Sequence, residues 1–224
     1  MLEESSSKDL NLNLNWKRKL FKETVQGGFN FNTNWHAVVQ KNLDPIFEKF
    51  SIKKILEIGS FEGQSTCYFS EKLTQGQIHC LDTWKGDDDL REKNIDFKII
   101  EKNFDKNIKL ANEINPNVNF FKYKSESYKQ LSKFIAEGKE NFFDLIYIDG
   151  AHDSQNVLFD AVSSFKLVKE GGVVIFDDYL WESKDKNIIN SPKFAIDSFV
   201  NIFSDKIYVI RHFLYQLYII KKSN

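Results

Sequence analysis

The apolar and polar positions of this chain follow two periods, one typical of buried strands and one typical of amphipathic helices. The clearest strand signals are two short apolar runs that each end in acidic residues. The run Leu145–Ile148 ends at Asp149, and the run Val173–Phe176 ends at Asp177 and Asp178. Such continuous apolar runs are typical of strands that are buried on both faces of a parallel sheet.

A helical pattern lies between these two runs. Its apolar residues recur at the i, i+3, i+4 and i+7 spacing of a helix face, namely Leu158, Ala161, Val162, Phe165 and Val168. Gly171 and Gly172 follow, and we expect them to end the helix because glycine readily turns left-handed. The stretch therefore predicts two parallel strands with a crossover helix. Ligands of open α/β sheets bind beyond the carboxyl ends of the strands, so the three aspartates mark a candidate site.

The same alternation of strand and helix patterns covers most of the chain. We expect strands at 52–58, 78–81, 118–123, 145–148, 173–176, 207–211 and 213–220. We expect helices at 64–73, ended by Gly76, around Phe97–Ile108, at 127–136 and from Pro192 onward. This order predicts an α/β fold, a Rossmann-like three-layer sandwich with a seven-stranded mixed sheet. The last two strands are joined too closely for a parallel crossover, so they form an antiparallel hairpin at the sheet edge.

The pattern divides the chain into three parts. Residues 1–15 are polar and low in complexity, and we expect them to be disordered. Residues 16–50 carry apolar positions of a helical extension, broken around Gly27 and Gly28. Residues 51–224 hold the α/β domain. In small α/β enzymes such an extension often covers the ligand.

Composition narrows the classes of partner. The formal net charge is −1 and charged residues make up 28% of the chain, so no strong field favours nucleic acid or an anionic membrane. No apolar run reaches the roughly 20 residues of a membrane span, and the polar start does not resemble a signal peptide. The two cysteines form neither a disulfide framework nor a metal-finger pattern. We expect a cytoplasmic protein with a small-molecule partner; a homo-oligomer is compatible with the sequence.

The loop after the first expected strand carries the next chemical signal. It reads Glu57-Ile58-Gly59-Ser60-Phe61-Glu62-Gly63, which has neither the G-x-G-x-x-G form of a dinucleotide loop nor the Gly-Lys-Ser/Thr of a P-loop. A carboxylate at the end of a buried strand, such as Glu57, needs a partner, and an amino group on a ligand would serve. Asp82 ends the second strand, near the spacing of roughly 20 residues at which an acidic side chain takes ribose hydroxyls. The alternative for the loop is a plain tight turn, and the alternative for Asp82 is an N-cap or loop carboxylate.

Four motifs in order carry a resemblance to a known family. They are ILEIGSFEGQST, IHCLDTWKGDD, FDLIYIDGAHDSQNVLFDAVSSFKLVKEGGVVIFDDY and YVIRHFLYQLYIIKK. Together they resemble the class I S-adenosylmethionine-dependent methyltransferases over roughly residues 52–222. The similarity is greatest to the small-molecule O-methyltransferase branch, which includes catechol O-methyltransferase and the macrocin and sugar O-methyltransferases.

The resemblance implies S-adenosylmethionine as a cofactor. Glu57, Gly59 and Ser65 would lie at its methionine end, and Asp82 would bind its ribose. The full implied set is Glu57, Gly59, Ser60, Gly63, Ser65, Asp82, Glu126, Ser127 and Asp149, with Glu126 and Ser127 beside the adenine.

The resemblance also implies a metal site. In the metal-dependent members, a divalent ion is held by the carboxylate after the fourth strand and a pair after the fifth, here Asp149, Asp177 and Asp178. Hard oxygen ligands favour Mg²⁺. The alternative is that Asp177 and Asp178 only line the cofactor pocket or cap a turn.

His152 and Asp149 are the candidate catalytic residues. His152 follows Asp149 by three residues, where the catechol-type enzymes place a lysine, and a histidine there can take a proton near neutral pH. The alternative is that His152 caps the following helix together with Asp153 and Ser154. Many macrocin-type relatives carry an aspartate where this chain has Ala151. An aspartate base at that position is therefore excluded, which weakens the case for a sugar or macrolide acceptor.

These signals predict an S-adenosylmethionine-dependent methyltransferase that methylates an oxygen of a small molecule with the help of a divalent metal. The alternative from another class is a non-catalytic S-adenosylmethionine-binding module. The missing G-x-G-x-x-G argues against an NAD-dependent oxidoreductase. The lack of a basic stripe argues against a nucleic-acid methyltransferase. Trp84, Tyr179 and Trp181 are either walls of an acceptor pocket or core residues.

Overall fold

The computed structural model describes residues 28–33, 35–86, 95–211 and 215–222. The predicted disordered stretch 1–15 and the first part of the predicted extension 16–50 lie outside these residues. No helix in the described ranges is long and apolar enough to cross a membrane.

Seven strands form one sheet in the order β3-β2-β1-β4-β5-β7-β6. The strands are β1 (Lys54–Ile58), β2 (Gly76–Asp82), β3 (Val118–Lys124), β4 (Phe143–Ile148), β5 (Val168–Phe176), β6 (Ile207–Arg211) and β7 (Leu217–Lys221). The first five strands pair in parallel, whereas β7 runs antiparallel to both of its neighbours, β5 and β6. The predicted mixed sheet with an antiparallel C-terminal strand is confirmed.

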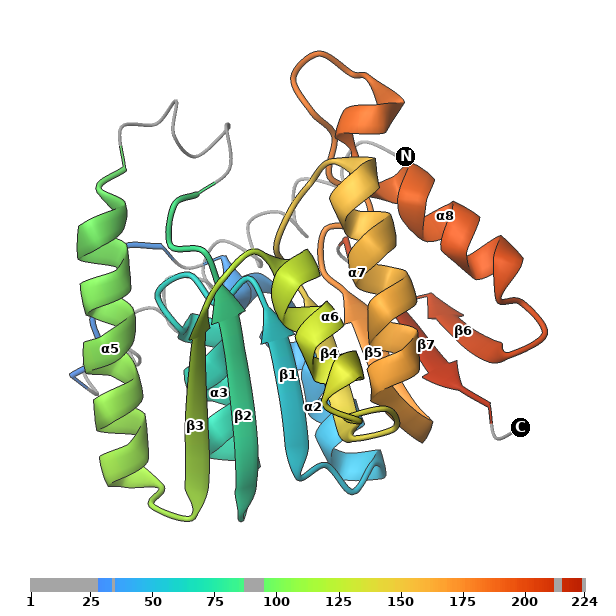
Figure 1. Cartoon of the computed structure of the whole chain (residues 1–224). Helices are drawn as coiled ribbons and strands as arrows, with labels where there is room; N and C mark the ends of the chain where they lie inside the picture. The colour runs from blue at the N-terminus through green and yellow to red at the C-terminus, as the bar shows by residue number, and fades with distance from the viewer. Residues whose placement is uncertain (1–27, 34, 87–94, 212–214, 223–224) are drawn as a thin grey trace, which may run out of the picture.

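Helices cover both faces of the sheet (Figure 1). They are α2 (His36–Lys49), α3 (Gln64–Lys72), α5 (Phe97–Ile114), α6 (Ser127–Ala136), α7 (Ser154–Leu167), the short 3-10 helix η1 (Ile188–Asn190) and α8 (Pro192–Ile202). Helices α6, α7 and α8 pack on one face, and α2, α3 and α5 pack on the other. The predicted three-layer sandwich is confirmed.

Alternating residues of each central strand feed two separate cores. In β1, Leu56 and Ile58 belong to the core beneath α6, α7 and α8, while Ile55 belongs to the core beneath α2, α3 and α5. In β4, Ile146 and Tyr147 divide in the same way. A strand with apolar side chains on both faces is stable only when both faces are covered. The continuous apolar runs of the sequence therefore reflect this double burial.

Two glycine assignments from the sequence are wrong. Gly76 does not end a helix: α3 ends at Lys72, and Gly76 is the first residue of β2. Likewise α7 ends at Leu167, and Val168 already belongs to β5. Gly171 has a φ of 74°, but it lies where the β4–β5 register shifts rather than at the helix end. The predicted helix ran one residue too far because Val168 fits both the helical spacing and the apolar run of a strand.

Candidate functional site

The carboxyl ends of β1, β4 and β5 are held together by backbone hydrogen bonds. The Asp149 N–H donates to the Ile58 carbonyl (2.8 Å), and the Asp177 N–H donates to the Ile148 carbonyl (3.0 Å). The Gly59 N–H donates to the Leu81 carbonyl of β2 (2.8 Å). This edge of the sheet therefore brings the loop after β1 next to the residues that follow β2, β4 and β5.

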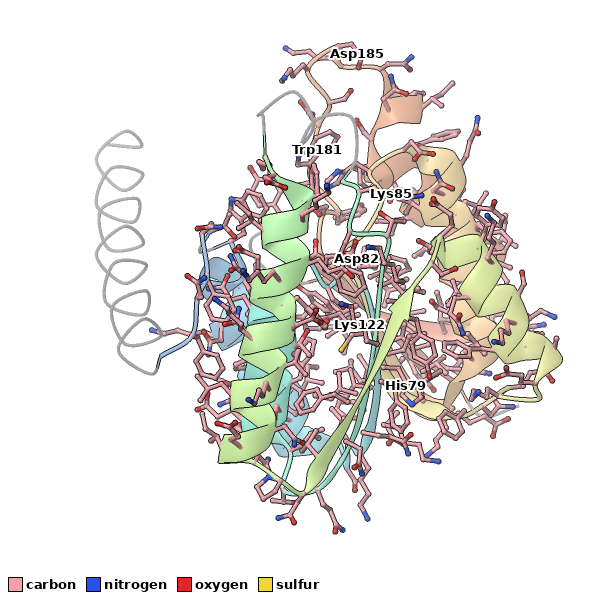
Figure 2. The ribbon with its side chains drawn as sticks, turned by 60° about the vertical axis from the view of Figure 1, so that its left-hand side comes forward. His79, Asp82, Lys85, Lys122, Trp181 and Asp185 are labelled. Carbon is pink, nitrogen blue, oxygen red and sulfur yellow. The ribbon has the colours of Figure 1, made fainter. Side chains whose placement is uncertain are left out.

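Asp82, at the end of β2, fixes the conformation of the loop 59–63. One of its carboxylate oxygens accepts the Phe61 N–H (2.8 Å), and the other accepts the Trp84 N–H (2.6 Å). Burial raises the pKa of Asp82, while these backbone donors act in the opposite direction. In Figure 2, Asp82 lies farther along the sheet than His79, toward Lys85 and Trp181.

The Trp84 indole also binds the loop 59–63. Its Nε1–H donates to the Phe61 carbonyl (2.8 Å). Phe61 and Trp84 both have positive φ values, 45° and 49°, which bulky residues rarely adopt. Trp84 is buried in the core beneath α2, α3 and α5, so of the two interpretations of this residue the structure favours core over acceptor wall.

Glu57 is fully buried below the loop. Its two carboxylate oxygens accept the hydroxyl groups of Ser65 and Thr66, in the first turn of α3. Burial raises the pKa of Glu57, and the hydroxyl donors act against that rise. Glu57 thus fastens the start of α3 to the end of β1. A contact with a cofactor amino group stays a prediction.

Asp149, Asp177 and Asp178 converge as expected. Each offers a carboxylate oxygen, and these atoms lie within 4.8 Å of one another. Burial, followed by the negative charges of its two neighbours, raises the pKa of Asp149 well above its ordinary range. Burial and Asp178 raise the pKa of Asp177 to about 7, and the Gln216 side-chain amide donates to Asp177. Such a cluster of partly buried carboxylates gains most from a bound cation.

His152 lies against this cluster. Its Nε2 is 3.1 Å from Asp178 Oδ2, and its ring stacks on Trp181 with centroids 4.4 Å apart. The helix-capping alternative is not supported, because the N-cap of α7 is Asp153, whose carboxylate accepts the Asn156 N–H. The imidazole therefore lies at the site, in contact with Asp178 and Trp181.

Glu126 and Ser127 lie at the start of α6, beyond the end of β3. Glu126 is the N-cap residue without a side-chain capping bond, and its carboxylate is 3.8 Å from Lys85 Nζ. Asp160 of α7, which the sequence analysis missed, is buried next to Ser127, and burial raises its pKa to about 7. An acidic residue between the core positions Val157 and Ala161 was the available signal.

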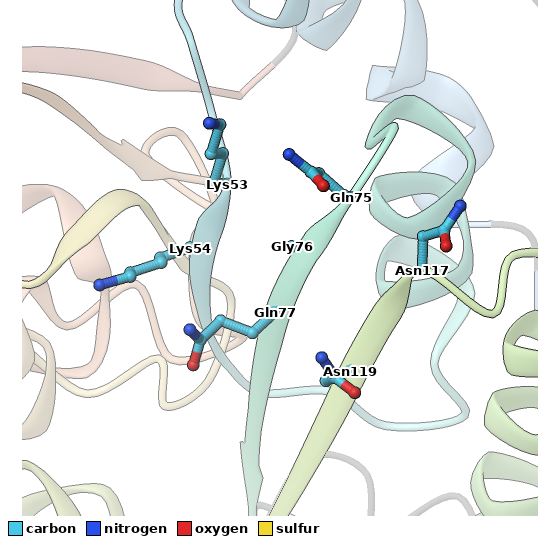
Figure 3. A pocket seen from close by; sticks show the side chains of 7 residues that line it. All are labelled: Lys53, Lys54, Gln75, Gly76, Gln77, Asn117 and Asn119. Carbon is cyan, nitrogen blue, oxygen red and sulfur yellow. The ribbon is translucent and has the colours of Figure 1, made fainter.

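A groove lies at the opposite end of the sheet (Figure 3). It has a volume of about 320 Å³ and is lined by Lys53, Lys54, Gln75, Gly76, Gln77, Asn117 and Asn119. These residues surround the amino ends of β1, β2 and β3. Ligands of open α/β sheets bind at the carboxyl ends, so the candidate site is the edge with the aspartates.

Comparison with known sequences gives a family and two relatives. The model of a methyltransferase domain matches residues 56–179, just over half of the chain. An uncharacterised protein, R132, of Acanthamoeba polyphaga mimivirus is 29% identical over 73% of this chain and 66% of its own length. A probable caffeoyl-CoA O-methyltransferase 3 of Dictyostelium discoideum is 24% identical over 68% of this chain and 55% of its own length. The chain thus spans less than two thirds of either relative.

Solved structures share the fold. An O-methyltransferase from Bacillus cereus in complex with SAH has a TM-score of 0.57, with 17% identity over 92% of this chain and 91% of its own. The O-methyltransferase TomG from Streptomyces achromogenes, in complex with SAM, has a TM-score of 0.61, with 15% identity over 84% of this chain and 81% of its own.

The matched segment contains three of the four motifs that carried the resemblance. It starts within the first of them, at β1, and ends at Tyr179, so it includes the loop 59–63, Asp82 and all three aspartates. The resemblance drawn from the sequence is confirmed: the chain belongs to the methyltransferase domain family.

Proposed function

We propose that this protein transfers the methyl group of S-adenosylmethionine to an oxygen atom of a small molecule, with a divalent cation held by three aspartates. The convergence of Asp149, Asp177 and Asp178 beside the loop 59–63 is the observation that carries the proposal. A donor site at this loop and a cation site at the aspartates would lie at one edge of the sheet, as a metal-assisted transfer requires.

The donor site is supported by the loop and by Asp82. The loop approaches the end of β4 so closely at Gly59 that a Cβ there would lie 1.9 Å from the Asp149 carbonyl oxygen. The absence of a side chain at residue 59 would let the methionine end of the donor approach the loop backbone closely. Asp82 keeps its carboxylate at the end of β2, where ribose hydroxyls would bind it. Ser60, Gly63 and Ser65 complete the proposed set at this end, and Glu126 and Ser127 the set at the adenine.

The residues present fit a divalent metal. Three carboxylates at mutual distances within 4.8 Å match the hard oxygen ligands of Mg²⁺. The raised pKa values of Asp149 and Asp177 come from burial and from repulsion by neighbouring carboxylates, which a cation would relieve. When bound, such an ion lowers the pKa of the acceptor hydroxyl.

His152 is the proposed base. The imidazole takes the proton that the acceptor hydroxyl loses as the acceptor oxygen bonds to the methyl carbon and the carbon–sulfur bond breaks, with the electron pair staying on sulfur. Because Nε2 faces the Asp178 carboxylate, Nδ1 is the nitrogen that takes this proton. Asp178 orients the imidazole through its contact with Nε2, and Trp181 supports the ring from one face. Ala151 offers no competing carboxylate.

Calorimetry with S-adenosylhomocysteine tests the donor site. We expect binding by the wild-type protein and at least tenfold weaker binding by Asp82→Ala, since a hydrogen bond to a charged group contributes roughly 1.5–3 kcal/mol. A matched control is Asp205→Ala, on the exposed turn before β6. Wild-type protein that does not bind, or equal binding by Asp82→Ala, would refute the donor site.

Titration with Mn²⁺, followed by electron paramagnetic resonance, tests the metal site. We expect the Asp177→Asn variant to lose most of its affinity, because the substitution removes one of three charged ligands. Equal Mn²⁺ affinity in both proteins would remove the metal assignment.

Turnover of S-adenosylmethionine with a panel of catechols, phenols and other hydroxyl acceptors separates the enzyme from the non-catalytic module. Formation of S-adenosylhomocysteine that depends on the acceptor supports the enzyme. Tight binding of S-adenosylhomocysteine without turnover on any acceptor class supports the module.

A further inference from the structure

A partly buried network of amides and one carboxylate joins the segment 28–33 to the rest of the fold. The Asn30 N–H donates to Asn107 Oδ1 (2.7 Å), and Asn30 Nδ2 donates to Asn103 Oδ1 (2.7 Å). Asn107 Nδ2 returns a hydrogen bond to the Asn30 carbonyl (3.0 Å). Phe31 is buried against Cys67 and Ala111, which anchors the segment between α3 and α5.

Glu62 is the centre of this network. It lies in the loop 59–63 and is 1% exposed. Its Oε2 accepts the Asn32 N–H (2.7 Å), and its Oε1 accepts Asn32 Nδ2 (2.8 Å) and Asn103 Nδ2 (2.8 Å). A buried carboxylate is tolerated only when its oxygens are hydrogen-bonded. The segment 28–33 and α5 supply these partners.

Further hydrogen bonds hold the backbone of the loop. Asn107 Nδ2 donates to the Glu62 carbonyl (2.8 Å), and the Gly63 N–H donates to the Ser60 carbonyl (2.7 Å). On the other side, the Phe61 N–H is bound by Asp82. Two sets of hydrogen bonds thus hold the loop: those from Asp82 at the end of β2, and those that join Glu62 to the segment 28–33 and to α5. Loss of the hydrogen bonds of Glu62 would free the loop backbone to move away from the sheet edge.

We propose that Glu62 is a positioning residue for the methyl donor, which links the segment 28–33 to the loop 59–63 and holds that loop in its donor-binding conformation. This inference rests on the proposed function. Glu62 itself does not touch the donor in this proposal, and it acts through the backbone of Gly59 and Ser60. Residues 30 and 32 then support donor binding indirectly, through Glu62, although they are far from the loop in the sequence.

Two single variants test the linkage. Glu62→Gln retains the shape of the side chain but replaces one acceptor oxygen with an NH₂ group that faces donors. Asn32→Ala removes the side-chain donor at an exposed position, where folding is least at risk. For each variant we expect S-adenosylhomocysteine to bind about tenfold more weakly, in line with the loss of a hydrogen bond to a charged group.

A double variant provides the rescue. Asn32→Asp alone places a second carboxylate at hydrogen-bond distance from Glu62 and should weaken binding most. Combining it with Glu62→Gln restores an amide–carboxylate pair with the roles exchanged, and we expect much of the affinity to return. Asn119→Ala, an exposed asparagine in the groove at the far end of the sheet, is the matched control with unchanged affinity.

The measurements are calorimetric affinity for S-adenosylhomocysteine, at a temperature where circular dichroism shows each variant folded, and steady-state kinetics. A positioning role predicts a raised KM for S-adenosylmethionine with a nearly unchanged kcat. Variants that melt at lower temperature but bind S-adenosylhomocysteine like the wild type would overturn the inference. Wild-type protein that does not bind would instead refute the proposed donor site.

Discussion

Replacement of Gly59 by alanine tests how tightly the loop and the end of β4 are joined. Gly59 has a φ of 91°, and an added Cβ would lie 1.9 Å from the Asp149 carbonyl oxygen and 2.7 Å from the Gly150 Cα. Both neighbours are backbone atoms, which have no side-chain freedom with which to yield. The loop and the end of β4 must therefore separate by about 1.5 Å to reach ordinary van der Waals contact.

The cost has two parts that a control can separate. An alanine with positive φ costs roughly 1–2 kcal/mol, and overpacking adds about 1–3 kcal/mol. Gly138 has a φ of 75° but nothing within 4 Å of its added Cβ. Gly138→Ala therefore carries only the first cost. We expect Gly59→Ala to lower the free energy of unfolding by about 2 kcal/mol more than Gly138→Ala does.

Urea denaturation at 25 °C gives the free energies of unfolding, and unchanged m-values show that the comparison is valid. Calorimetry with S-adenosylhomocysteine reports the second effect. Displacement of Asp149 from the loop should abolish binding by Gly59→Ala and leave Gly138→Ala like the wild type. Equal free energies of unfolding for the two variants, with equal binding, would refute the close approach as the reason for glycine at this position.

Three further predictions concern a buried histidine, a buried lysine and the proposed base. Burial lowers the pKa of His36 to about 3, so between that value and about 6.5 the unfolded chain binds a proton that the folded protein does not. The free energy of unfolding therefore falls as pH falls, and His36→Phe should remove about 2 kcal/mol of the fall between pH 7 and 5. Urea denaturation of both proteins at each pH measures this, and a difference in free energy of unfolding between them that is the same at pH 7 and pH 5 would contradict it. Lys221 Nζ donates to the Asn141 side chain and to two carbonyl oxygens near the end of α7, so Lys221→Met should cost about 2–4 kcal/mol in chemical denaturation, whereas Lys106→Met, at an exposed position of α5, should cost about 0.5 kcal/mol or less. His152→Ala should lower kcat by roughly 10²–10⁴ and leave affinity for S-adenosylhomocysteine unchanged, and full activity would exclude His152 as the base.

Local patterns were sufficient for the elements themselves. The helix Ser127–Ala136 and the strand Ile207–Arg211 were predicted with the boundaries that the structure has, because their apolar spacing matches one period only. Where a residue suits two periods, as Val168 does, the boundary is wrong. The pairing of β4 with β5 sets the boundary between α7 and β5 at Val168, and this pairing is a contact between segments that are distant in sequence.

The convergence of Asp149, Asp177 and Asp178 was also predictable from sequence. Each aspartate follows a buried parallel strand, and parallel strands end at the same edge of a sheet. The sheet order then makes β4 the neighbour of β5, so the three carboxylates meet. A repeating period and a topological rule together were enough to place this cluster.

The partners of single side chains were decided only by the tertiary structure. Glu57 was expected to need a partner, and the structure gives its carboxylate two hydroxyl groups from α3, which no pattern in the sequence indicated. Glu62 showed no signal at all, since its donors Asn32 and Asn103 lie 30 and 41 residues away. The sequence by itself determined which segments are buried strands and which strand ends carry charge, because periodicity and composition are local properties. Which donor reaches which carboxylate depends on how separate elements pack, and only the folded chain decides that.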